Sequence, residues 1–129
     1  MKDKVLIDTN VAVSILNGEA STKEALRTFS RTYVSITVLG ELLFGAKNSQ
    51  KQQSNLRRID KLLSACRLLQ LGADTAQHYA IIRKQLLDKG RPILENDIWI
   101  AAACLEHSLP ICTFDKPFEY VDGLDVISL

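Results

Sequence analysis

The sequence predicts an α/β fold in which helices flank a parallel, doubly wound sheet. Short apolar segments rich in branched residues alternate along the chain with longer segments whose apolar residues recur at helical spacing. This alternation is typical of strand–helix–strand units, in which successive strands run parallel. No repeat, low-complexity tract or Pro- and Gly-rich linker divides the 129 residues, so we expect one domain over residues 1–129.

Five segments have the short, branched and apolar composition of buried strands. In chain order they are KVLI (4–7), YVSI (33–36), RLLQL (67–71), LPICT (109–113) and DVISL (125–129). Three longer segments have the helical pattern, namely NLRRIDKLLSA (55–65), TAQHYAIIRKQLLDKG (75–90) and NDIWIAAACLEHSL (96–109). The second of them ends at Gly90, which is typical of a helix C-cap.

The composition is that of an ordinary globular protein, with 47% hydrophobic residues, 24% charged residues and a formal net charge of +1. No apolar run approaches the roughly 20 residues of a membrane span, and the N-terminus lacks the architecture of a signal peptide. The three cysteines show no metal-ligand spacing, so we expect free thiols in a cytoplasmic protein. Two basic stretches, 47–67 and 83–91, are either solvated helix faces or contacts for a phosphate backbone.

Four acidic residues stand near the predicted carboxyl ends of strands, where parallel sheets usually bind their ligands. In chain order they are Asp8, Glu41, Asp97 and Asp115. Taken singly, Asp8 could be a helix N-cap and Asp115 a turn residue. Asn96 could likewise cap a helix whose dipole favours Asp97 in its first turn. Glu41 is harder to explain in this way, because apolar residues surround it in VLGELLFGA.

The four acids together indicate a divalent cation. Two unit charges about 4 Å apart repel by about 4 kcal/mol at an effective dielectric constant near 20, so clustered carboxylates need protons or a counter-ion. Oxygen ligands without Cys or paired His suit Mg²⁺ or Mn²⁺ better than Zn²⁺. Such ions bind phosphate oxygens and activate water, which points to phosphodiester hydrolysis. The sequence contains no GxxxxGK[ST] loop, so nucleoside triphosphate binding is not expected.

At this point the chain resembles the PIN-domain ribonucleases, and among them the VapC toxins of bacterial toxin–antitoxin modules. The resemblance rests on four motifs that occur in the family's order and cover nearly the whole chain. They are LIDTNV, SITVLGELLFGA, ILENDIWIAAAC and ICTFDKPF. Each motif is short, but the four in sequence at family-like separations are specific.

The resemblance implies roles for individual residues of this chain. The catalytic and metal-binding acids would be Asp8, Glu41, Asp97 and Asp115. The polar residues that support them would be Thr9, Asn10, Asn96 and Thr113. For contacts to the substrate phosphates, our candidates are Lys47 and Arg91.

The resemblance also implies a five-stranded parallel sheet, homodimerisation and endoribonuclease activity that depends on Mg²⁺, with Mn²⁺ as a substitute. It further implies an RNA substrate and a small antitoxin protein that inserts residues into or across the acidic site. No membrane association is expected.

Three alternatives remain open on the sequence alone. A phospho-receiver domain has a similar length and fold, but it needs paired acids after its first strand, and here Thr9 and Asn10 follow Asp8. A catalytically silent PIN module would be expected to lose acids, and this chain keeps four. A housekeeping RNA-processing nuclease without an antitoxin is the third alternative, although the chain carries no added RNA-binding or zinc module.

Overall fold

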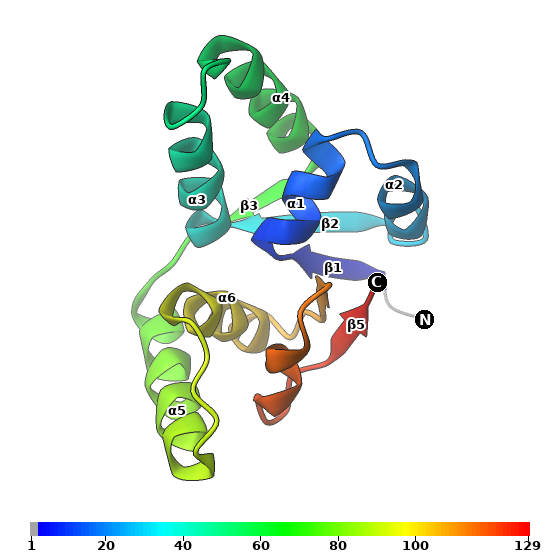
Figure 1. The fold of residues 1–129 in the computed structure, drawn as a ribbon. Helices are drawn as coiled ribbons and strands as arrows, with labels where there is room; N and C mark the ends of the chain where they lie inside the picture. The colour runs from blue at the N-terminus through cyan, green and yellow to red at the C-terminus, as the bar shows by residue number, and fades with distance from the viewer. Residues whose placement is uncertain (1–2) are drawn as a thin grey trace.

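The computed structural model describes residues 3–129, and its strands form one five-stranded sheet with the order β3–β2–β1–β4–β5 (Figure 1). Every neighbouring pair of strands is parallel. The strands are β1 (Lys4–Ile7), β2 (Arg31–Ser35), β3 (Arg67–Leu69), β4 (Ile111–Thr113) and β5 (Val126–Ser128). The predicted α/β fold with a parallel sheet of five strands is confirmed.

Within residues 3–129, six α-helices and one short 3₁₀ helix accompany the sheet. They are α1 (Thr9–Leu16), α2 (Ala20–Leu26), α3 (Ile36–Lys47), α4 (Gln52–Ala65), α5 (Ala73–Lys89), α6 (Glu95–Glu106) and the 3₁₀ helix η1 (Lys116–Tyr120). In Figure 1, α1 to α4 lie in the upper part of the view around β2 and β3, and α5 and α6 lie in the lower part. The acidic residues introduced above lie where these two groups of helices meet.

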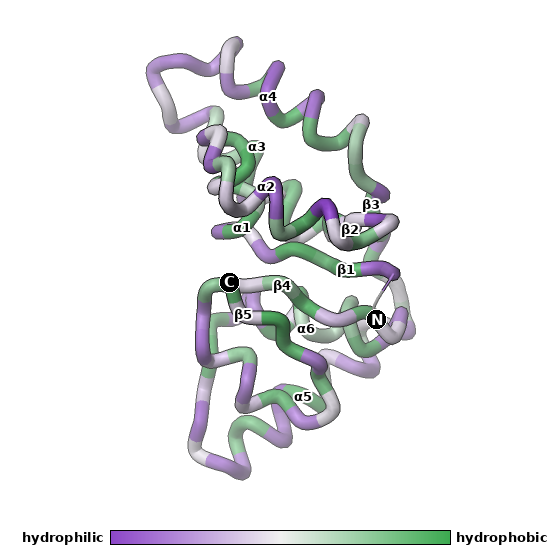
Figure 2. Tube along the Cα trace, turned by 90° about the vertical axis from the view of Figure 1, so that its right-hand side faces the viewer, coloured by the Kyte–Doolittle hydropathy of each residue, from purple (hydrophilic) through white to green (hydrophobic). Residues whose placement is uncertain are grey.

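The centre of the sheet forms the core of the molecule. Val5, Leu6 and Ile7 of β1 and all of β4 are buried, and Figure 2 shows these two strands in the middle of the molecule, with β1 coloured as hydrophobic. Helix α6 contributes six buried residues to the same core. Because β1 and β4 are neighbours in this rigid centre, the residues that follow them are held firmly at one edge of the sheet.

Several predicted boundaries need correction. Ile36 begins α3 instead of ending β2, because the Ser35 hydroxyl accepts a hydrogen bond from the backbone N–H of Val38 and caps the helix at a distance of 3.3 Å. Helix α6 begins at Glu95 with Leu94 at its N-cap position, so Asn96 lies inside the first turn and is not a cap.

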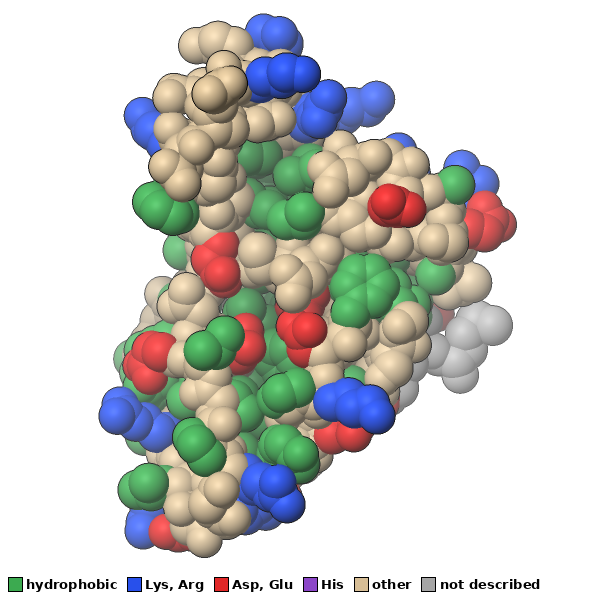
Figure 3. All heavy atoms as spheres, viewed as in Figure 1, with side chains coloured by type: hydrophobic (Ala, Val, Ile, Leu, Met, Phe, Trp, Pro, Cys, Tyr) green, Lys and Arg blue, Asp and Glu red, His purple; other side chains and the backbone are tan. Residues whose placement is uncertain are grey.

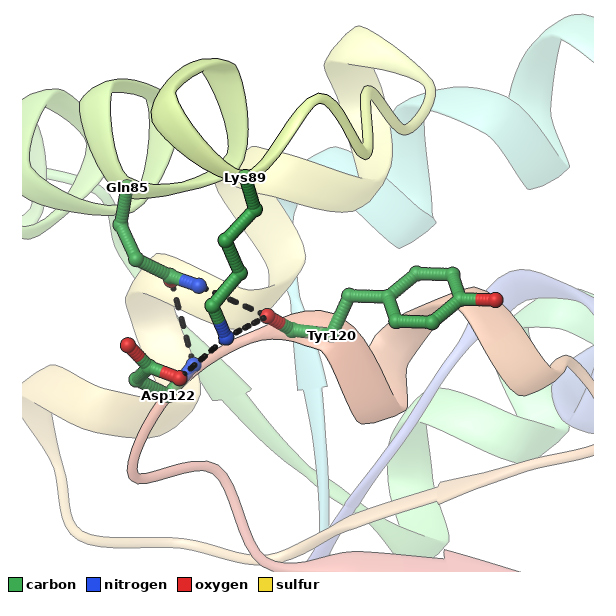
Figure 4. Close-up of polar contacts among 4 residues, drawn as sticks. All are labelled: Gln85, Lys89, Tyr120 and Asp122. Carbon is green, nitrogen blue, oxygen red and sulfur yellow. Dashed lines mark hydrogen bonds and ion pairs between the residues drawn. The ribbon is translucent and has the colours of Figure 1, made fainter.

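Helix α5 ends as predicted. Gly90 adopts a left-handed conformation with φ of 65°, which a glycine tolerates without the steric cost that a Cβ would bring. The side chains of the last two turns then hold the segment after η1 (Figure 4). Gln85 donates to the carbonyl of Tyr120 at 2.7 Å and accepts from the N–H of Asp122 at 3.1 Å, while Lys89 contacts the Asp122 carboxylate at 2.5 Å. This clamp ties the chain that follows β4 to α5.

The cysteines at positions 66, 104 and 112 are free thiols, as predicted. Burial raises the pKa of Cys66 and of Cys112 to about 11, so neither thiol is poised to act as a nucleophile near neutral pH. None of the helices formed by residues 3–129 combines the length and apolar character that crossing a bilayer requires.

Candidate acidic active site

The sheet and two helices bring the four predicted acids to one region. Asp8 directly follows β1, and Asp115 lies two residues after β4, the strand that pairs with β1. Glu41 comes from the second turn of α3, and Asp97 comes from the first turn of α6. Figure 3 shows acidic side chains gathered over the waist of one face, while most Lys and Arg side chains of that face lie toward its ends.

Asp8 has a structural role as well as a place among the acids. Its side chain is 3% exposed, and one carboxylate oxygen (Oδ1) accepts from the backbone N–H of Val11 at 3.0 Å, which caps α1. The other oxygen (Oδ2) accepts from the hydroxyl of Thr113 at 2.5 Å. The predicted N-cap is therefore confirmed, and each carboxylate oxygen still has a lone pair for a further partner.

Thr113 connects two of the acids from inside the protein. Its side chain is fully buried, donates to Asp8 and accepts from the backbone N–H of Asp115 at 2.9 Å. One hydroxyl thus orients the Asp8 carboxylate and fixes the backbone that carries Asp115. This geometry explains why a polar residue stands at the end of an otherwise apolar strand.

The two residues after Asp8, Thr9 and Asn10, orient Glu41 and Asp115. The Thr9 hydroxyl donates to Oε1 of Glu41 at 2.8 Å, and the Asn10 amide donates to Oδ2 of Asp115 at 3.1 Å. The tripeptide Asp8–Thr9–Asn10 therefore supplies one carboxylate and orients two others. The hydrogen bond from Thr9 explains how an apolar helix can carry Glu41, since it satisfies one oxygen of the carboxylate.

The acids also influence each other electrostatically. Burial and, after it in order, the negative charges of Asp8, Glu41 and Asp115 together raise the pKa of Asp97 to about 6. Burial likewise raises the pKa of Asp8, against the hydrogen bonds from Thr113 and Val11, and the charges of Asp115 and Glu41 add to the rise. The four carboxylates therefore behave as one cluster that favours a proton or a cation.

The donor set fits a hard divalent cation that keeps part of its water shell. The cluster offers carboxylate oxygens, and Asp8 and Asp97 carry the raised pKa values of carboxylates that need positive charge. Among residues 3–129, no three His, Cys, Asp or Glu side chains form a ready-made metal cage. Mg²⁺ does not need one, because it typically binds one or two carboxylates directly and retains several waters.

Two cavities flank the acids. The larger, of about 630 Å³, lies between α1, the loop before α6 and the segment after β4, and its lining includes Asn10, Ile93, Asp97 and Asp115. The smaller, of about 210 Å³, lies between α1, α3 and α4 on the Glu41 side and is mostly apolar. A substrate in the larger cavity would contact Asp97 and Asp115.

The remaining predicted site residues lie farther from the cluster. Asn96 is exposed in the first turn of α6 and does not hydrogen-bond to any of the four acids within residues 3–129. Lys47 is exposed at the end of α3, about 9 Å along the helix axis from Glu41. Arg91 lies next to the loop that lines the larger cavity, with its guanidinium 5.0 Å from the centre of the Tyr120 ring.

Sequence reasoning missed two parts of this region. The loop residues Pro92, Ile93 and Leu94 line the larger cavity, and Leu94 is 75% exposed. Phe114, between Thr113 and Asp115, is 45% exposed although it directly follows a buried strand. An apolar residue between two polar site residues is the sequence signal that could have singled out Phe114.

The PIN domain family model matches residues 5–124. The tRNA(fMet)-specific endonuclease VapC of Shigella flexneri is 34% identical over 124 residues, which cover 94% of each chain. Ribonuclease VapC5 of Mycobacterium tuberculosis is 30% identical over 120 residues, with 92% of this chain and 87% of the relative covered. The alignments span almost the whole of each protein.

A solved structure shows the same fold. DNA-bound VapBC of Salmonella typhimurium contains a chain that superposes with a TM-score of 0.90 at 28% identity, covering 99% of this chain and 98% of that chain. The receiver-domain alternative is excluded by these matches. The acidic cluster, the parallel five-stranded sheet and the full-length relatives agree: the chain belongs to the PIN-domain family and, within it, to the VapC ribonucleases of VapBC toxin–antitoxin modules.

Proposed function

We propose that this protein is an endoribonuclease that depends on Mg²⁺ or Mn²⁺ and serves as the toxin of a VapBC-type module. The observation that carries the proposal is the cluster of Asp8, Glu41, Asp97 and Asp115, whose charges reach one another beside a cavity of about 630 Å³. The relatives that align over the whole chain are named as ribonucleases and endonucleases. An active cytoplasmic toxin therefore fits both the site and the family.

In this proposal Asp8, Asp97 and Asp115 hold the cation. The cation supplies positive charge for the phosphate and lowers the pKa of the attacking water. Thr113 keeps Asp8 aimed at the cluster, and Asn10 does the same for Asp115.

Glu41 orients the attacking water. The Thr9 hydroxyl occupies Oε1 of Glu41, so Oε2 remains available to accept a hydrogen bond from that water. Because the acceptor is already oriented, the water is placed without a further loss of side-chain freedom.

Lys47 and Arg91 would contact the phosphates on either side of the cleaved bond. Both are exposed, Lys47 at the end of α3, the helix that carries Glu41, and Arg91 in the loop before α6, the helix that carries Asp97. Positive charge beyond an acidic centre compensates for the repulsion between the RNA backbone and the carboxylates. Asn96 would support Asp97 through its place in the same helical turn.

We further propose a small antitoxin as partner and a homodimer as the working form. Toxin–antitoxin complexes are described for related structures, including one from Klebsiella pneumoniae. In this chain, the apolar cavity of about 210 Å³ ends at Glu41, so a partner with an apolar anchor and a basic side chain could fill the cavity and neutralise the acids. A short open reading frame next to the gene would distinguish this toxin from a housekeeping nuclease.

The test is RNA cleavage by the purified protein with Mg²⁺, with Mn²⁺ and with EDTA. We expect cleavage only with a divalent cation, and its loss in Asp8→Asn and Asp97→Asn. The matched control is Asp88→Asn, because Asp88 is an exposed acid of α5 that is paired with Lys84 at 2.8 Å. Full metal-dependent cleavage by Asp97→Asn would contradict the proposed site, and cleavage in EDTA would contradict the cation.

A further inference from the structure

A third cavity, lined mostly by polar residues, adjoins the acidic site on the side of α2. Its volume is about 390 Å³, and it lies between α1, the start of α2 and the ring of Phe114. Asn10 lines both this cavity and the larger cavity that contains Asp97 and Asp115. The two spaces therefore meet at Asn10, whose amide is fixed by its hydrogen bond to Asp115.

Phe114 lines this cavity, and its backbone is fixed on both sides. Thr113 before it is fully buried and bonded to Asp8, and the backbone N–H of Asp115 after it is bonded to Thr113. Both neighbours in the chain are thus fixed, so the backbone of residue 114 is fixed as well. The ring is nevertheless 45% exposed and, within residues 3–129, stacks on no other aromatic ring. An exposed aromatic ring on a fixed stretch of backbone beside the acids offers a stacking surface.

Apart from Val13, the other residues that line the cavity are polar. The hydroxyls of Ser14 and Thr22 are hydrogen-bonded to each other at 2.7 Å and join α1 to α2. Asn17 and Glu19 also line the cavity and are exposed, and their amide and carboxylate present both donors and acceptors. One aromatic face with polar groups around it matches a nucleobase, which has an apolar π-face and a polar edge.

We propose that this cavity is a nucleobase pocket, in which Phe114 stacks on a base next to the cleaved phosphodiester bond. The pocket requires an unpaired base, so it selects single-stranded or looped RNA. The inference rests on the proposed ribonuclease function. It places the cleaved phosphate at the four acids and the neighbouring base in the polar cavity, on the other side of Asn10.

The first test compares cleavage by Phe114 variants on a single-stranded RNA oligonucleotide that the wild type cuts at one bond. Loss of one base–aromatic stack corresponds to roughly 5- to 150-fold, so we expect kcat/KM of Phe114→Ala to fall by about tenfold or more. Phe114→Tyr should retain the rate, whereas Phe114→Leu, which keeps bulk but not the π-face, should resemble Phe114→Ala. Phe44→Ala is the matched control, since Phe44 is a 70% exposed phenylalanine of α3 that lines neither cavity.

The second test removes the base instead of the ring. Two oligonucleotides are compared, one with an abasic nucleotide directly before the cleaved bond and one with it directly after. The wild type should cleave one of these two substrates more slowly than the intact oligonucleotide. At that position Phe114→Ala should cause no further loss, because the two changes remove the same stack. Additive losses at both positions would overturn the proposal.

A binding measurement separates this inference from the proposed function. In an Asp97→Asn background, an RNA oligonucleotide carrying 2-aminopurine should change its fluorescence on binding, and Phe114→Ala should abolish that change. If no RNA were cleaved under any condition, the proposed function would fail while this measurement still decided the pocket. Unchanged oligonucleotide binding in Phe114→Ala, with weaker binding of the antitoxin instead, would overturn the pocket and make this surface a protein contact.

Discussion

Asp97→Asn is expected to stabilise the metal-free protein while it removes activity. The pKa of Asp97 is raised to about 6 from its usual 3.8, chiefly by burial and then by the charges of three other acids. A rise of about two pH units, at about 1.4 kcal/mol each, sets a ceiling of about 3 kcal/mol on the cost of ionising this group in the folded state. Asp97 is partly solvated at the cavity, so we expect about 1–2 kcal/mol of stabilisation at pH 7.

The sign of the pH dependence follows from the same shift. Because the folded pKa lies above the unfolded one, the folded state binds more protons between about pH 4 and pH 6. The free energy of unfolding contributed by Asp97 therefore falls as the pH rises through that window. In Asp97→Asn this fall is absent. The difference in the free energy of unfolding between the variant and the wild type should therefore shrink as the pH is lowered toward 4.

Urea denaturation in EDTA at pH 4.5 and pH 7.5 measures both effects. The control is Asp88→Asn, whose exposed carboxylate should change the free energy of unfolding by less than about 0.5 kcal/mol. Added Mg²⁺ should stabilise the wild type more than Asp97→Asn, because the stability added by a ligand rises with the logarithm of its concentration relative to Kd. A destabilised Asp97→Asn protein, or an advantage that does not change with pH, would refute the reasoning.

Three further outcomes test the surrounding structure. Thr113→Val removes two buried hydrogen bonds and should lower the free energy of unfolding by about 2–4 kcal/mol in urea denaturation. Thr113→Ser keeps the hydroxyl and should lose less. Equal losses in the two variants would show that packing, and not the hydrogen bonds, accounts for the effect. Thr9→Val should lower kcat with little change in KM, because it frees Glu41 to rotate without altering the cavity that binds RNA; an unchanged kcat would separate Glu41 orientation from the rate. Gly90→Ala should lower the free energy of unfolding by about 1 kcal/mol, because a Cβ is strained at φ of 65°; a neutral result would show that α5 can end differently.

The elements whose pattern is local were predictable from the sequence. The branched run KVLI forms β1 with the predicted bounds, and the helical stripe before Gly90 forms α5. Helix α2 was not predicted, because its sequence ASTKEAL has too few apolar residues to show a period. The interpretation of Asn96 as a helix cap was wrong: the N-cap position is Leu94, two residues earlier, and the acids Glu95 and Asp97 in the first turn favour this helix start without a side-chain cap.

The acids of the site were predictable as a set, but not their partners. Parallel strands end at one edge, which is enough to bring Asp8 near Asp115. The hydrogen bond from Asn10 to Asp115 joins residues 105 apart in sequence, and the bond from Thr9 to Glu41 joins residues 32 apart. Such pairs depend on side-chain directions that only the assembled sheet and helices define. For the same reason the sequence could single out Phe114 as an apolar residue between two polar site residues, but it could not place its ring at a cavity.

Anomalous diffraction from crystals soaked in Mn²⁺ tests the central claim most directly. The predicted result is a Mn²⁺ peak among Asp8, Asp97 and Asp115, with Asn10 and Thr113 still bonded to the carboxylates that they orient. The peak should be lost in crystals of Asp97→Asn. Mn²⁺ bound elsewhere, or a peak that survives in Asp97→Asn with undiminished strength, would contradict the assignment of these acids to a catalytic cation site.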